Sequence, residues 1–219
     1  MKCWTNLEEV INEPNCLIAG VPGSGKSVLI NSLLFNITAH RYSFCVIDLK
    51  RVELKRWSKS SCSCGSAVTP EGANRLLDGV IALMEKRYVE MENSMQTHYK
   101  GQRLYVVIDE LADLMTYKGI EEKLLKIVRL GRAAEVHIIM ATQDPSRRTI
   151  SGRIQACVTS AVALRCRSAI ESRMIIKKTG AENLPDFGEG IFQNSRSHYY
   201  ILDVPLTPDE MIIERIKAS

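Results

Sequence analysis

A glycine-rich run near the start of the chain constrains the fold more than any other feature. Residues 20–27 read Gly-Val-Pro-Gly-Ser-Gly-Lys-Ser and fit the phosphate-loop pattern G-x-x-x-x-G-K-[ST], directly after the apolar run 15–19. Glycines at this spacing let backbone N–H groups turn inward around a β-phosphate, while Lys26 reaches the β- and γ-oxygens and Ser27 binds Mg²⁺. A helix that begins at about Lys26 directs its positive end at the same phosphates. The pattern predicts a site for ATP and Mg²⁺.

A second motif indicates what the nucleotide is for. Residues 104–110 read Leu-Tyr-Val-Val-Ile-Asp-Glu, an apolar run typical of a buried parallel strand that ends in two carboxylates. Open α/β sheets bind ligands at this carboxyl end of their strands. We expect Asp109 to hold Mg²⁺ through water and Glu110 to polarise the water that attacks the γ-phosphate. A kinase takes its nucleophile from a substrate and has less need of Glu110, so the pair favours hydrolysis.

The order of apolar runs predicts an α/β fold. Strands are expected at 16–20, 44–48, 104–110, 136–143 and 160–166, helices at 26–40, 69–95 and 120–134, and a C-terminal β-hairpin from 189–194 and 198–204. Alternating strands and helices imply a mostly parallel sheet with helices on both faces. The segment 58–66 is rich in Ser, Cys and Gly, and we expect a loop there.

Composition narrows the class of protein. With 219 residues and 45% hydrophobic content, the chain is long enough for one domain, residues 1–219. No apolar stretch approaches the roughly 20 residues that cross a bilayer, and the N-terminus lacks a signal-peptide core, so we expect a soluble, cytoplasmic protein. Seven cysteines, mostly inside apolar runs, favour reduced core thiols. Cys62 and Cys64 lack a second Cys or His pair that would indicate zinc.

The net charge of +4 says little, but basic residues cluster in two segments after predicted strands. Each cluster is either a solvated face or a set of contacts to a nucleic-acid phosphate backbone, and the sequence leaves both open. The candidates for DNA contact are Lys50, Arg51, Lys55, Arg56 and Lys59 in the first segment and Arg147, Arg148 and Arg153 in the second.

Several motifs together resemble one family. They are the phosphate loop through Val28, the string Val-Ile-Asp-Glu-Leu-Ala-Asp-Leu-Met at 107–115, Gly-Arg-Ala-Ala-Glu-Val-His at 131–137 and Ala-Thr-Gln-Asp-Pro-Ser at 141–146, with weaker matches at 84–88, 171–173 and 180–182. In this order they resemble the FtsK/SpoIIIE motor domain, a hexameric DNA translocase related to HerA. The resemblance spans about residues 12–204 and implies a RecA-like P-loop NTPase.

The resemblance assigns roles by position. It implies that Gln143 senses the γ-phosphate and that Arg132 is an arginine finger delivered into the neighbouring subunit's site, beside the roles already given to Lys26 and Glu110. Without the family, Arg132 is better read as an arginine pairing with carbonyls at the end of its own helix. The nucleotide-binding set is Gly20, Val21, Pro22, Gly23, Ser24, Gly25, Lys26, Ser27, Val28 and Asp109. The implied partner is double-stranded DNA, held in a homo-hexameric ring.

The chain also departs from the family. It begins some 14 residues before the first predicted strand, without the family's membrane-spanning region and most of its ring-building domain, and it ends without the winged-helix module that reads orienting DNA sequences. Asp144 stands where many relatives carry a basic residue. We therefore expect a small stand-alone motor from a mobile element, plasmid or phage, with a loading or membrane partner but no direct insertion into the membrane.

Two other functions remain open. Conjugation coupling proteins and type VII secretion ATPases resemble this family and act on protein or nucleoprotein cargo; tandem motor domains or a membrane anchor would favour them. A nucleotide-binding interaction module with little turnover is the third reading. Intact Lys26, Asp109 and Glu110 argue against that module.

Overall fold

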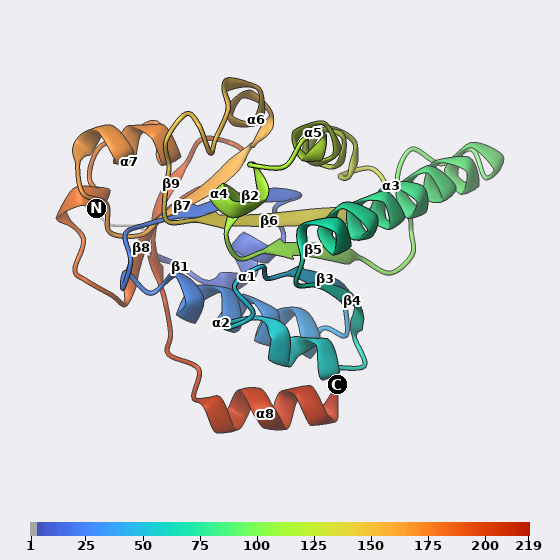
Figure 1. Cartoon of the computed structure of the whole chain (residues 1–219), viewed down its shortest axis with the longest axis horizontal. Coiled ribbons are helices and arrows are strands. Elements are labelled where there is room, and N and C mark those ends of the chain that lie inside the picture. The colour runs from blue at the N-terminus through green and yellow to red at the C-terminus, as the bar shows by residue number, and fades with distance from the viewer. Residues whose placement is uncertain (1–3) are drawn as a thin grey trace.

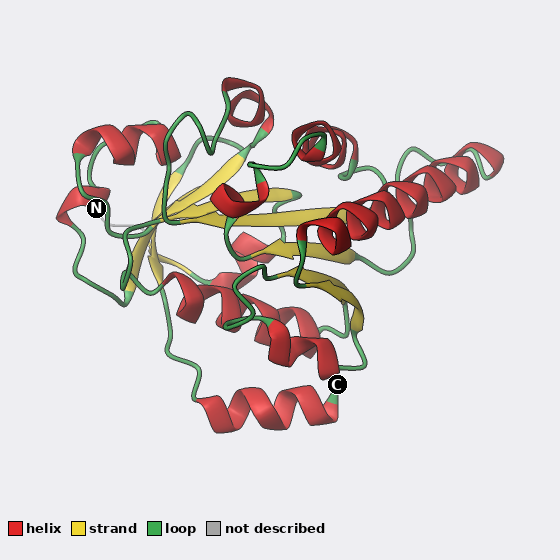
Figure 2. Cartoon of the chain, in the orientation of Figure 1, coloured by secondary structure: helices red, strands yellow, loops and turns green. Residues whose placement is uncertain are grey.

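A twisted β-sheet runs through the centre of the molecule, with helices on both faces (Figures 1 and 2). The computed structural model describes residues 4–219, and within them nine strands form one sheet in the order β1-β9-β8-β7-β2-β6-β5-β3-β4. The strands are β1 (Trp4–Thr5), β2 (Asn15–Ala19), β3 (Ser43–Ile47), β4 (Ser63–Ala67), β5 (Leu104–Ile108), β6 (Val136–Thr142), β7 (Ser160–Ala163), β8 (Glu189–Gln193) and β9 (Tyr199–Asp203). The helices are α1 (Leu7–Ile11), α2 (Lys26–Ala39), α3 (Pro70–Asn93), α4 (Leu111–Leu114), α5 (Ile120–Leu130), α6 (Gly152–Cys157), α7 (Ala169–Ile176) and α8 (Asp209–Ala218), with 3₁₀ turns η1 (Lys55–Lys59) and η2 (Ala181–Asn183).

The sheet is parallel from β7 through β2, β6, β5 and β3 to β4, and β8 runs antiparallel to both β7 and β9. The predicted mostly parallel sheet is confirmed, and so is the C-terminal hairpin. Strand β6 lies between β2 and β5, with Met140 paired to Leu17 on one side and to Ile108 on the other. The ends of β2, β6 and β5 therefore meet at one edge of the sheet.

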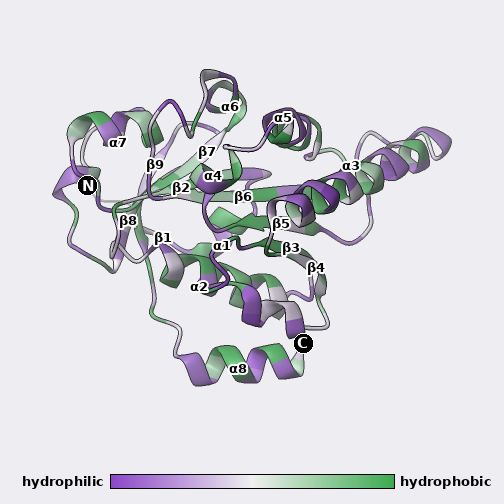
Figure 3. Cartoon of the chain, in the orientation of Figure 1, coloured by the Kyte–Doolittle hydropathy of each residue, from purple (hydrophilic) through white to green (hydrophobic). Residues whose placement is uncertain are grey.

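The central strands are buried along their whole length because helices cover both faces. Every residue of β2, β5 and β6 is buried, and these strands form the apolar centre of Figure 3. One core lies between the sheet and α3, α5, α6 and α7, and the other between the sheet and α1 and α2. Helix α8 contacts α2 and forms a further layer outside it (Figure 1). None of the described helices combines the length and hydropathy needed to cross a membrane.

The prediction of a loop over 58–66 is wrong. This segment holds the end of η1 and the edge strand β4, which pairs with β3 through backbone bonds such as Phe44 N–H to Cys62 O at 3.0 Å. Small side chains conceal the strand from a hydropathy pattern, because an edge strand is held mainly by its backbone. Cys64 is exposed on β4, and the described residues contain no cluster of three metal-ligating side chains.

Two further expectations need correction. The helix predicted to reach residue 134 ends at Leu130, and a tight turn follows in which Glu135 has φ of 51°. The helix predicted to reach residue 95 ends at Asn93, and Met95 lies beyond its end and is 94% exposed. After the hairpin, the amphipathic helix α8 adds an element that the sequence analysis missed.

A buried arginine joins α3 to the two loops that lead into β5 and β6. Arg87 donates from Nη1 to Ala134 O at 2.7 Å and Glu135 O at 3.0 Å, and from Nη2 to Gln102 O at 2.8 Å. Its guanidinium also lies over the Tyr99 ring, 4.4 Å from the centroid. Burial lowers the pKa of Arg87 through desolvation, yet a guanidinium stays charged at any ordinary pH.

We expect Arg87→Lys to lower the free energy of unfolding by about 2 kcal/mol or more, because one ammonium cannot serve three carbonyls that the planar guanidinium fork reaches together. Urea unfolding followed by circular dichroism measures the change. The matched control is Lys86→Ala on the exposed side of the same helix, for which we expect a change within about 0.5 kcal/mol. Equal urea midpoints for Arg87→Lys and the unchanged protein would contradict this role.

Candidate nucleotide site

The phosphate loop leads from β2 into α2 and forms an open cradle of backbone. Gly23 and Gly25 have φ of 80° and 89°, a conformation that favours glycine. A Cβ added at Gly20 would lie 2.7 Å from Leu164 Cβ, so that position also requires glycine. Gly25 caps α2 without any side-chain hydrogen bond, and the buried Ser24 Oγ has no partner among the described residues. Free backbone donors at a helix N-terminus fit an anionic phosphate.

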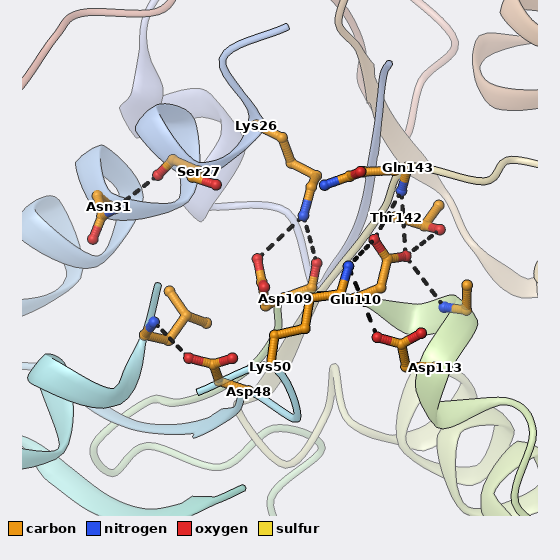
Figure 4. A network of polar contacts seen from close by, with 12 residues as sticks. Lys26, Ser27, Asn31, Asp48, Lys50, Asp109, Glu110, Asp113, Thr142 and Gln143 are labelled. Carbon is orange, nitrogen blue, oxygen red and sulfur yellow. Dashed lines mark hydrogen bonds and ion pairs between the residues drawn. The ribbon is translucent and has the colours of Figure 1, made fainter. Parts of the chain in front are cut away.

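Lys26 is buried where the phosphate loop meets the end of β5. Its side chain is 5% exposed, and Nζ donates to Asp109 O at 2.8 Å and to Asp109 Oδ1 at 3.1 Å (Figure 4). Desolvation raises the pKa of Asp109, and the ammonium of Lys26 opposes that rise. A carboxylate and a serine hydroxyl are suitable oxygen ligands for Mg²⁺, and in a phosphate loop the lysine ammonium binds the phosphates.

Glu110 is held by donors from three segments. Its Oε1 accepts from Thr142 Oγ1 at 2.7 Å and from Ala112 N–H at 3.3 Å, so it also caps α4. Gln143 N–H lies 3.2 Å from Oε2, and Lys50 Nζ lies 3.5 Å from the same oxygen (Figure 4). Because β6 lies between β2 and β5, Gln143 reaches the space between Lys26 and Glu110. The structure therefore brings together Lys26, Asp109, Glu110 and Gln143.

Arg132 lies at the other edge of the sheet. It is exposed in the turn before β6, whose seven residues span about 20 Å to the edge that carries Gln143. It lines a cavity of about 610 Å³ together with Arg129 and Arg196. In the described part of the chain none of these three arginines forms an ion pair. The nearby carboxylate of Glu135 is bound by His137 and Arg103, and these hydrogen bonds lower its pKa to about 2.

The basic residues proposed from the sequence do not form one surface. Residues around η1 pack into the α2 side of the sheet, whereas α6, which carries Arg153, contacts α5 on the opposite face. Three candidates are ion-paired: Lys50 with Glu110 and Asp113, Arg56 with Asp209 of α8 at 2.7 Å, and Arg153 with Glu122 at 3.1 Å. The remaining five are exposed and, within residues 4–219, form no ion pair: Arg51, Lys55, Lys59, Arg147 and Arg148.

Sequence reasoning missed two of the groups that hold this site together. The sequence predicts only a strand position for Thr142, whereas in the structure its hydroxyl forms the shortest hydrogen bond to Glu110. The charge pattern predicts a DNA contact for Lys50, yet the ammonium of Lys50 faces Glu110 and Asp113. A polar residue at the end of a buried strand next to Gln143 is a usable signal for Thr142. Asp144, in turn, binds Ser146 and Thr149 inside its own loop.

Known proteins are similar to this chain in sequence and in fold. Residues 5–99 match the FtsK/SpoIIIE family. The DNA translocase FtsK of Lactiplantibacillus plantarum is 38% identical over 206 residues, covering 82% of this chain and 26% of that protein. FtsK of Tropheryma whipplei is 35% identical over 213 residues, covering 85% of this chain and 29% of that protein. The chain thus spans about a quarter of the length of the curated relatives it matches.

The fold of this chain is also similar to that of a solved structure. The pCW3 conjugation coupling protein TcpA, solved as a monomer with ATPγS, superposes with a TM-score of 0.84 at 22% identity, over 94% of this chain and 65% of that one. At that identity the likeness establishes the P-loop ATPase fold. Together with the family match and the relatives at 35% and 38% identity, it leads to one conclusion: the chain belongs to the FtsK/SpoIIIE family.

Proposed function

We propose that this protein hydrolyses ATP and uses the energy to move double-stranded DNA as a hexameric ring of identical subunits. The observation that carries the proposal is the convergence of Lys26, Asp109, Glu110 and Gln143 beside the open phosphate loop. Family membership supports DNA as the cargo, because the relatives described above are DNA translocases. A cytoplasmic location fits the described cysteines, which are all free thiols.

The phosphates would bind the N-terminal end of α2 and the ammonium of Lys26. Ser27 and Asp109 would hold Mg²⁺, which neutralises phosphate charge when it is bound. Lys26 now donates to Asp109, so ATP would offer the same ammonium a second set of acceptors. No other positive group lies as deeply buried beside the loop among the described residues, which makes Lys26 the residue we expect ATP binding to depend on most.

Glu110 would position and polarise the attacking water. Glu110 is 7% exposed, and its carboxylate accepts a hydrogen bond from the backbone N–H of Gln143, so a γ-phosphate that moves Gln143 would also act on Glu110. This contact supports the role of Gln143 as a sensor. The hydrogen bond from Thr142 Oγ1 would keep the Glu110 carboxylate oriented before the substrate binds.

We expect Glu110→Gln to bind ATP with unchanged affinity and to lower kcat by about 10² to 10⁴, the usual worth of a positioned general base. An amide oxygen still accepts from Thr142, so the fold around the site should survive. Equilibrium ATP binding and steady-state phosphate release measure the two effects. The control is Asp113→Asn, which shares the contact to Lys50 but lies outside the site. Full turnover in Glu110→Gln would refute the assignment.

Arg132 would act on the neighbouring subunit. Its distance along β6 from the phosphate loop excludes action on its own nucleotide, and the arginine-lined cavity of about 610 Å³ offers room for the phosphates of another subunit. Arg87 supports the role, because it binds the carbonyls of Ala134 and Glu135 in the turn that carries Arg132. Turnover would then require assembly.

We expect ATP turnover per subunit to rise steeply with protein concentration, and Arg132→Ala to lower it by up to about 10³ to 10⁵ while ATP binding persists. Mixing Arg132→Ala with Lys26→Ala should restore part of the activity, because the second variant supplies Arg132 to the intact site of the first. The readout is phosphate release across the mixing ratio. Mixtures no more active than either variant would contradict action between subunits.

DNA would contact the exposed basic residues that form no ion pair. We expect Lys55→Ala with Lys59→Ala to lower DNA-stimulated turnover, leave ATP affinity intact and reduce the slope of log K against log salt for DNA binding by about 2, since each lost phosphate contact removes about 0.9. The matched control is Arg56→Ala, whose side chain is occupied by Asp209. Unchanged stimulation would remove η1 as a DNA contact, and turnover indifferent to DNA in every variant would favour a protein cargo.

A further inference from the structure

An exposed aromatic side chain lies against the phosphate loop. Phe187, in the segment between η2 and β8, is 73% exposed, which makes it one of the most exposed large apolar side chains among the described residues. A Cβ placed on Gly25 would lie 3.9 Å from the Cβ of Phe187, in ordinary van der Waals contact. The Phe187 side chain therefore starts beside Gly25, the residue before Lys26, although most of the surface of Phe187 is exposed to solvent.

The segment that carries Phe187 is tied to the phosphate loop by its neighbours rather than by the ring. The side chain of Asp186 forms an ion pair with Arg165, and the carbonyl of Arg165 accepts a hydrogen bond from Val21 N–H at 2.9 Å. On the other side, Gly188 has φ of 90°, and its carbonyl accepts from Val204 N–H at 2.9 Å. Phe187 is thus placed beside the loop without having to bury its ring in the core.

The position of Phe187 suits one part of a nucleotide. The phosphates belong at the N-terminus of α2 and at Lys26, so the nucleoside must extend outward from the cradle towards solvent-facing groups. A flat, exposed aromatic ring at the rim can stack on a planar heteroaromatic base, and such stacking is worth about 1 to 3 kcal/mol per base in proteins that bind nucleic-acid bases. Nothing else that we have assigned to the site contacts a base.

We propose that Phe187 forms the nucleobase subsite, stacking on the base of the nucleoside triphosphate whose phosphates occupy the phosphate loop. The inference rests on the proposed function, since it needs the triphosphate to bind there. The ion pair between Arg165 and Asp186 positions the segment that carries Phe187, and the Phe187 ring itself contacts the base. A stacking platform separates a nucleoside triphosphate from inorganic triphosphate, which has no base.

The experiment compares two ligands, ATP and inorganic tripolyphosphate, by calorimetric titration in the presence of Mg²⁺. In Phe187→Ala we expect ATP to bind about tenfold more weakly and tripolyphosphate to bind as in the unchanged protein. Phe187→Tyr keeps the aromatic face and should restore ATP affinity to within about twofold. The matched control is Leu206→Ala, which removes an equally exposed apolar side chain from the segment before α8.

The outcomes separate the two proposals. Equal weakening of ATP and tripolyphosphate in Phe187→Ala would show that the segment supports the loop rather than the base, and would overturn the stacking role. Unchanged ATP affinity would overturn it as well. If the unchanged protein bound neither ligand, the proposed ATPase function would fail first; if it bound both equally well, the ATPase proposal would stand and the base subsite would not.

Discussion

The contact between Lys26 and Asp109 is the constraint on which the rest of the site depends. It joins the start of α2 to the end of β5, although β6 lies between β5 and the strand that leads into α2. A buried ammonium is tolerated only with partners close by, so β2, β6 and β5 must end at the same level. The register of the three strands aligns their carboxyl ends. It also places Gln143, which follows β6, between the phosphate loop and the Asp109-Glu110 pair.

Much of this arrangement could be predicted from the sequence, because the decisive elements carry strong signals. The strands β2, β5 and β6 are continuous apolar runs buried on both faces, and the phosphate loop has a fixed spacing. Strand β4 could not be predicted, since Ser63, Cys64 and Gly65 show neither apolar alternation nor bulk and the strand exists through its backbone pairing with β3. Helix α8 was missed, although Ile212 and Ile216, which are buried four residues apart, carry the spacing of an amphipathic helix.

For the candidate site, sequence patterns identified residues but not their partners. The ion pairs of Lys50 with Glu110 and of Arg56 with Asp209 of α8 join segments that are far apart in the chain. Both residues look like free surface charge in a charge pattern. Within the basic segment 50–59, Lys50 and Arg56 thus form ion pairs that hold the fold together, whereas the remaining basic residues are available to a ligand. The two faces of the sheet also separate the basic residues around η1 from Arg153 on α6.

Glu110 is also the N-cap of the short helix α4, because its Oε1 accepts a hydrogen bond from Ala112 N–H. A four-residue helix has little cohesion of its own. If the carboxylate turns towards a substrate, the first turn of α4 loses its cap, and Leu111 and Leu114, both buried in the core beneath α3 and α5, lose their anchor. The chemical group and the packing of one sheet face are thereby mechanically linked, so that a movement of a single side chain at the nucleotide can be transmitted to an entire layer of helices.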